Sequence, residues 1–166
     1  MNNNEFNIQR KEKTFFTTLS FFIPDENLTA CISSILEDVI KKYSIPEQSI
    51  VDIHFSKTEQ KEQKLISVAI KYYNFNPYEL KALDKEEQIR FVLNFMGYAD
   101  EDIESISYEK RDGEIRWKAE VLDPEYDFDP DESECEWGFI SSKEDEIREA
   151  LGFGVDMRFS FKGPRE

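Results

Sequence analysis

The chain has 166 residues, and its 36 Asp and Glu against 21 Lys and Arg give a formal net charge of -15 at pH 7. A chain this acidic repels a phosphate backbone and an anionic membrane surface, which argues against direct nucleic-acid binding and against membrane association. Hydrophobic residues make up 39% and aromatic residues 14% of the chain, far more than an acidic disordered tail contains. We therefore expect a folded protein with a substantial core.

The sequence carries no visible targeting or membrane signal. Residues 1–5 lack the basic region and the apolar run of a signal peptide, and no stretch approaches the length of a membrane span. Cys31 and Cys135 match no metal-binding or disulfide spacing. We expect a cytoplasmic protein with two reduced thiols, no metal and no cofactor.

The first elements in chain order are a lead-in, a strand and a helix. Residues 1–12 are polar and aperiodic, so we expect them to be a flexible lead-in. Apolar side chains alternate over 14–23, which indicates a strand, and take the helical period over 28–43. Asp25 or Asn27 is the expected N-cap of this helix.

A hairpin and two helical segments are expected next. Residues 51–55 and 66–72 alternate as strands, and the polar residues 56–64 between them are expected to form a loop. Asn76, with Pro and Glu after it, starts a short helical turn, and Asp84 repeats the start signal for a full helix.

The second half of the chain repeats this mixture of elements. Asp112-Gly113 between two alternating runs predicts a tight hairpin, because both turn positions need positive φ. Residues 137–140 are expected to form a short strand. A third helix is expected to begin at Ser141 or Ser142, followed by a final strand at 155–161.

These elements predict the α+β class, with a mainly antiparallel sheet and about three helices packed on it. The element order over 14–108 also matches a ferredoxin-like unit. Because no repeat or low-complexity linker divides the chain, we expect one domain over 13–166 with an acidic C-terminal half at 98–149.

The negative charge is concentrated in this half. Residues 98–149 contain 20 acids and 6 bases, and within them residues 123–136 contain eight acids and no base. Tyr126 and Phe128 alternate with acids, so in an extended chain the two rings would face the core and the carboxylates the solvent. A solvated loop is the plain interpretation of such a segment.

An interaction surface is the functional interpretation, because interleaved aromatic anchors have no purpose in a disordered tail. We predict an inhibitor or adaptor, not an enzyme, that occupies the basic site of a partner protein such as a nuclease or another nucleic-acid-binding protein. The predicted partner-binding residues are Asp123, Glu125, Asp127, Asp129, Asp131, Glu132, Glu134, Glu136 and Trp137.

DNA mimicry is the most specific form of this prediction. Duplex DNA carries one charge per ~1.7 Å, whereas acids at every second strand residue give one per roughly 6.7 Å. Mimicry would therefore need further acidic rows from 100–102, from the hairpin 109–120 and from the third helix. Small acidic anti-restriction and anti-CRISPR proteins, and immunity proteins that neutralise nuclease toxins, share this general character by analogy alone.

Two alternatives come from other functional classes. The Asp-x-Asp-x-Asp run at 127–131 begins like an EF-hand loop, but Glu132 and Gly138 stand where that loop needs Gly and Glu, which leaves an irregular cation site as the alternative. His54, the only histidine, shares a strand face with Asp52 and could act as a general base in a small enzyme. A polar strand residue is the simpler interpretation of His54.

Overall fold

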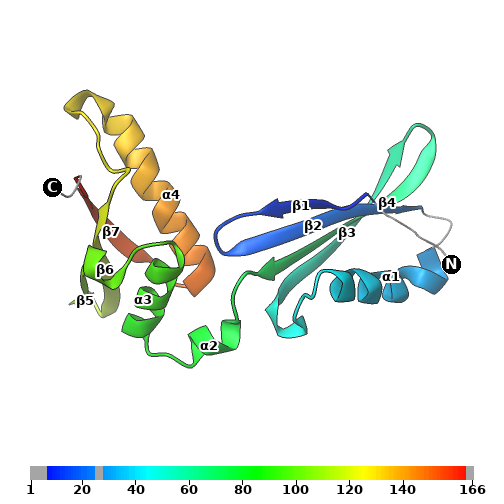
Figure 1. Ribbon diagram of the computed structural model, residues 1–166, viewed down its shortest axis with the longest axis horizontal. Coiled ribbons are helices and arrows are strands. Elements are labelled where there is room, and N and C mark those ends of the chain that lie inside the picture. The colour runs from blue at the N-terminus through cyan, green and yellow to red at the C-terminus, as the bar shows by residue number, and fades with distance from the viewer. Residues whose placement is uncertain (1–6, 25–27, 164–166) are drawn as a thin grey trace. The chain divides into compact units, whose positions relative to one another are not determined.

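The computed structural model describes residues 7–24 and 28–163, without the side chains of 28–31 (Figure 1). The chain divides into two compact units, 1–78 and 79–166, and each unit has its own sheet. The boundary falls inside the short helix α2 (Pro77–Lys81), so no flexible linker marks it, which is why the sequence reads as a single domain. Within the described ranges, no helix has the length and apolar character needed to cross a membrane.

Unit 1 contains an antiparallel sheet of four strands in the order β1-β2-β4-β3. Its outermost strand β1 lies within the segment that we expected to be a flexible lead-in, and it pairs with β2 from Gln9 opposite Ser20 onward. The bounds of the strands are β1 (Gln9–Glu12), β2 (Phe16–Pro24), β3 (Ile50–Gln60) and β4 (Gln63–Tyr73).

Helix α1 (Leu28–Lys42) covers one face of this sheet (Figure 1). Ile35 and Val39 of α1 pack on inward-facing side chains of β2 and β4. The apolar residues at helical spacing and those at strand spacing therefore form one core. The expected caps Asp25 and Asn27 lie outside the described residues, as does the side chain of Cys31. The buried core residues are Leu19, Phe21, Ile23, Ile35, Val39, Ile45, Ile66, Val68, Ile70 and Tyr72.

The ferredoxin-like prediction holds for only half of its range. Strand β4 lies between β2 and β3 and is antiparallel to both, which is the split β-α-β arrangement of that fold. The strand that should complete the unit, Ile103–Arg111, belongs instead to the sheet of unit 2, and β1 takes the edge beside β2. A ferredoxin-like unit over 14–108 is therefore wrong.

The strands of the hairpin β3–β4 extend beyond the residues whose apolar alternation predicts them. Residues 56–64, which we expected to form a loop, continue both strands as far as the pair Gln60 and Gln63. Lys61 and Glu62 form the turn with φ of +50° and +66°, the sign that a two-residue hairpin turn requires. The backbone ladder continues here without apolar side chains because its hydrogen bonds are made by the main chain.

Unit 2 contains a mixed sheet in the order β5-β6-β7. β5 (Ile103–Arg111) and β6 (Glu114–Asp123) form the predicted hairpin, whose turn residues Asp112 and Gly113 have φ of +53° and +80°. β7 (Val155–Phe161) runs parallel to β6 after a helical crossover. Because the other described strand pairs are antiparallel, the predicted α+β class with mainly antiparallel pairing is confirmed.

Two helices pack on the sheet of unit 2. α3 (Lys85–Phe95) contacts β5 and α4, and α4 (Ser133–Leu151) contacts β7. Asp84 is the N-cap of α3, as predicted, and its side chain accepts a hydrogen bond of 2.9 Å from the backbone N–H of Glu87. Together with α1, these are the three longer helices that the sequence predicts.

Helix α4 begins earlier than expected. Residues 137–140 are helical, so the predicted short strand is wrong, and the start signals at Ser141 and Ser142 lie inside the helix. The helix starts after the short 3-10 helix Pro130–Glu132. It ends as predicted at Gly152, which takes the left-handed conformation with φ of +83°.

Candidate functional site

The charge asymmetry of the sequence coincides with the structural division. Unit 2 (79–166) contains 26 acids and 12 bases, whereas unit 1 (1–78) contains 10 acids and 9 bases. Almost the whole net charge of -15 therefore lies on unit 2. Unit 2 therefore carries the charge that would attract a basic surface.

An aromatic cluster fixes the acid-rich residues 123–136, which we call the acidic segment, to the body of unit 2. Tyr126 and Phe128 pack on Phe139 of α4, and Tyr126 and Phe139 also pack on Phe159 of β7. Ring centroids within the cluster are 5.2 to 5.9 Å apart. The rings thus face inward, as their alternation with Asp127 and Asp129 predicts, while both carboxylates are exposed.

Asp123 is a structural residue and does not belong to a partner surface. It is only 4% exposed. One carboxylate oxygen accepts a hydrogen bond from the hydroxyl of Tyr98, and the other accepts one of 2.7 Å from the backbone N–H of Glu125. Burial and the adjacent Asp123 raise the pKa of Tyr98 well above its ordinary value. The inclusion of Asp123 among the partner-binding residues is therefore corrected, because strand β6 points this side chain into the unit.

Asp129 and Glu132 share a local structural role. They form a capping box, in which Asp129 accepts from the backbone of Glu132 and Glu132 accepts from the backbone N–H of Asp129 at 3.2 Å. Pro130 at the first position of the 3-10 helix fixes the turn. Both side chains are exposed, but their carboxylates are partly engaged by the backbone.

Glu136 also has a partner within the unit. It accepts a hydrogen bond from the hydroxyl of Tyr126 and is half-buried. This hydrogen bond raises the pKa of Tyr126 above its ordinary value, with a smaller contribution from burial. Glu136 therefore helps to hold the acidic segment in place more than it contributes to the outer surface.

The remaining predicted residues are all exposed, and we refer to them together as the acidic face. Its members are Glu125, Asp127, Asp131, Glu134 and Trp137, all exposed. Residues 123–142 contain no Lys or Arg, so no base from the same stretch of chain neutralises these carboxylates.

Trp137 is the most exposed large apolar side chain of the described residues, at 72%. It lies two positions before Phe139 on α4, which turns it about 200° away from the aromatic cluster. A tryptophan exposed to this degree is uncommon, because a side chain of this size is normally largely buried. Tryptophan is also among the residues that dominate binding energy at protein interfaces.

The acidic rows that DNA mimicry would need are partly neutralised by bases. Glu109 and Glu120 of the hairpin 109–120 lie close to basic side chains, and Lys118 lowers the pKa of Glu109 through a hydrogen bond. Asp102 is buried as well. The N···O distances are 3.1 Å for Lys118–Glu109, 4.0 Å for Arg158–Glu120, 2.7 Å for Lys162–Asp102 and 3.6 Å for Arg90–Asp100.

The structure adds little support for a cation site, for His54 or for Cys135 as a functional site. Among the described residues, no group of three or more His, Cys, Asp and Glu side chains is placed to hold a metal ion. His54 is exposed on the face of the unit 1 sheet opposite α1, across from Ala69. Cys135 is an exposed free thiol in the first turn of α4.

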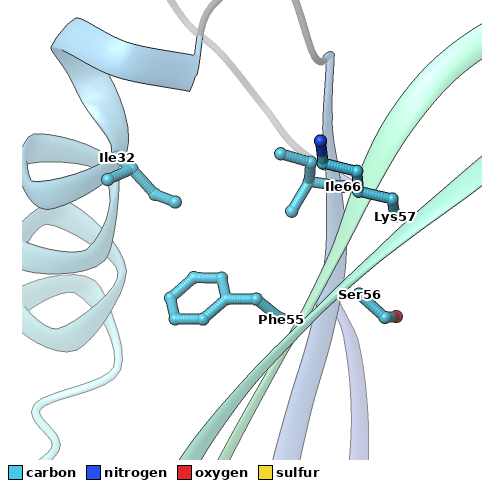
Figure 2. Close-up of a pocket in the computed structure, with 5 residues that line it drawn as sticks. All are labelled: Ile32, Phe55, Ser56, Lys57 and Ile66. Carbon is cyan, nitrogen blue, oxygen red and sulfur yellow. The ribbon is translucent and has the colours of Figure 1, made fainter.

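The sequence did not reveal a groove in unit 1 beside the edge strand β3. Figure 2 shows Ile32 of α1 facing Phe55 of β3 and Ile66 of β4 across this space. The groove has a volume of about 280 Å³, and Ser56 and Lys57 complete its lining. A strand residue on an inward face is normally counted as core, and only the structure shows that Phe55 is left 43% exposed.

Comparison with protein-family models, with curated proteins and with solved structures finds no match to this chain. Function is therefore inferred from the residues of the site itself.

Proposed function

We propose that the protein is an acidic inhibitor or adaptor whose acidic face occupies the basic site of a partner protein. The observation that carries this proposal is the exposed Trp137, on a stretch of chain that also carries exposed carboxylates and no base. A segment that served only as a solvated loop would have no use for an exposed indole.

Each part of the acidic face would contribute differently to binding. Carboxylates at the rim attract a basic surface over long range and raise the association rate, an effect that salt weakens. Trp137 offers a large apolar area, the kind of contact that slows dissociation. The aromatic cluster keeps the segment ordered before binding, which lowers the entropy lost in the complex.

The partner that we propose is a nuclease or another nucleic-acid-binding protein in the cytoplasm. Sites that bind nucleic acid are rich in Lys and Arg, and unit 2 has the complementary charge. The ion pairs on the other acidic rows favour a compact contact around Trp137 over an extended imitation of DNA. An immunity protein that neutralises a nuclease toxin would use the same face, so the identity of the partner separates the two roles.

Affinity capture with matched charge variants tests this proposal. The test variant carries Asp127→Asn, Asp131→Asn and Glu134→Gln, none of which has a described side-chain partner. The control carries Glu37→Gln, Asp38→Asn and Glu47→Gln, three exposed acids of unit 1. Both variants lose three negative charges, so a difference between them reports on position and not on net charge.

We expect a partner that binds the wild-type chain and the control variant, binds the test variant at least ten-fold more weakly, and dissociates as salt rises. Duplex DNA should compete with the chain for that partner. Equal loss of binding in both variants would contradict the proposal, as would a partner that holds DNA and this chain together.

A further inference from the structure

We infer that Trp137 makes the acidic face selective for arginine, so that its partner segment is arginine-rich and not merely positively charged. This inference rests on the proposed function and names the chemistry of the partner. It concerns the side of the first two turns of α4 that carries the exposed Glu134 and Trp137. Charge complementarity favours a basic segment as the occupant of this side.

The geometry of α4 brings the indole close to a carboxylate. Helical side chains lean toward the N-terminus of their helix, so Trp137 leans toward the turn that contains Glu134, three positions before it. Both side chains are exposed. Of the other neighbours one turn away, Ser133 and Ser141 are small, and Ile140 is partly buried.

An aromatic ring on the inner side of α4 already has a cation over it, whereas residues 123–142 supply none to the ring on the outer side. Lys143 lies over the ring of Phe139, 5.4 Å from its centroid, which shows that an aromatic ring of this helix accepts a cation. The Trp137 indole is the better acceptor of the two, because tryptophan binds cations more strongly than phenylalanine. Residues 123–142 supply no Lys or Arg to it.

Arginine fits this pair of groups better than lysine does. A guanidinium is planar, so it can stack on the indole and donate two parallel hydrogen bonds to the Glu134 carboxylate at the same time. A lysine ammonium is a compact and strongly hydrated charge that gains less from the ring. A second copy of this chain is a poor occupant, because two acidic faces repel each other.

Calorimetric titration with hexaarginine and hexalysine tests the inference on the whole chain. We expect hexaarginine to bind roughly two- to five-fold more tightly than hexalysine, the range of one exposed cation–π contact. Trp137→Leu should reduce this ratio to about one, while Trp137→Phe should keep part of it. Tyr78→Leu, which removes an exposed ring of unit 1, should leave the ratio unchanged, and circular dichroism should show that each variant is folded.

Equal binding of the two peptides by the wild-type chain would overturn the arginine selectivity, yet leave the proposed function in place if the binding still depends on Asp127, Asp131 and Glu134. Arginine selectivity that survives Trp137→Leu would also overturn it. Binding of neither peptide at low salt would overturn both proposals. Sedimentation that shows a dimer lost on Trp137→Leu would assign the face to a second copy and refute the inference.

Discussion

The hydroxyl of Tyr126 donates a hydrogen bond to the carboxylate of Glu136, and this contact joins the acidic segment to the first turn of α4. The same tyrosine ring packs on Phe139 and Phe159. One side chain thus connects the segment to both the helix and the sheet of unit 2.

Tyr126→Phe should keep the ring contacts and remove only the hydrogen bond. We expect a loss of about 1 kcal/mol in the free energy of unfolding, the usual net contribution of one such bond. Urea denaturation measures this loss. Tyr108→Phe, at a tyrosine that is exposed, should change the stability by less than about 0.5 kcal/mol, and an equal loss in both variants would contradict the role of Glu136.

The same substitution should affect stability differently at Asp123 and at Asp127. Asp123→Asn alters the acceptor of two hydrogen bonds, a buried one from Tyr98 and a partly buried one from the backbone of Glu125, and should cost about 1–3 kcal/mol of stability. Asp127→Asn alters an exposed side chain and should cost almost nothing. Partner binding should show the reverse order after correction for the unfolded fraction. Similar destabilisation by both substitutions would remove the distinction between the structural and the exposed acids.

Alkaline titration should separate two of the seven tyrosines. The pKa values of Tyr98 and Tyr126 are raised above the ordinary value of 10.0, mainly by burial for Tyr98 and by the hydrogen bond to Glu136 for Tyr126. The folded chain therefore holds these protons more tightly than the unfolded chain, so both contributions to stability are complete below pH 10 and decline as the pH rises above it. Absorbance at the phenolate band should show these tyrosines ionising last, and Tyr98→Phe should remove part of that late phase.

Glu144 gives a prediction for the acidic range. Partial burial and the nearby Asp156 raise the pKa of its carboxyl above the ordinary value of 4.5, against a hydrogen bond from the backbone of Met157. The folded chain then binds the proton more tightly than the unfolded chain, so the contribution of Glu144 to stability declines as the pH rises above about 4.5. Thermal melts between pH 4 and 7 should show a smaller decline for Glu144→Gln. A steeper decline in this variant would contradict the assignment.

Elements with a strong local period were predictable, and those defined by tertiary packing were not. The apolar alternation of β2 and the helical period of α1 identify both correctly, and Asp112-Gly113 marks the β5–β6 turn. Lys61-Glu62 makes an equivalent turn without Asn or Gly, so its residue types do not indicate a turn. The long β3–β4 ladder was missed for this reason.

The start of α4 shows how a local pattern misleads. Trp137 to Ile140 is aromatic and β-branched around a glycine, which locally favours a strand. Phe139, Lys143 and Ile147 nevertheless follow the helical spacing, and the capping box of Asp129 and Glu132 sets an earlier start. Packing of Phe139 on Tyr126 and Phe159 decides the outcome, and those partners are distant in the sequence or on another element.

The candidate site was predictable in its location and only partly in its residues. Charge density alone identifies the segment around Asp127, and the alternating rings indicate which side is buried. Composition cannot show that Asp123 points inward from the end of β6, or that Glu136 accepts a hydrogen bond from the hydroxyl of Tyr126. It also cannot show that Trp137 is directed to solvent, because that direction follows from its position on the helix α4.

The central claim is that the acidic face of unit 2 binds a basic partner, and one measurement tests it most directly. The affinity of a captured, purified partner should be measured for the wild-type chain, for the triple neutralisation at Asp127, Asp131 and Glu134, and for the matched one at Glu37, Asp38 and Glu47. The account predicts at least a ten-fold loss of affinity for the first variant and less than a two-fold loss for the second. Equal affinities for the two variants would contradict it.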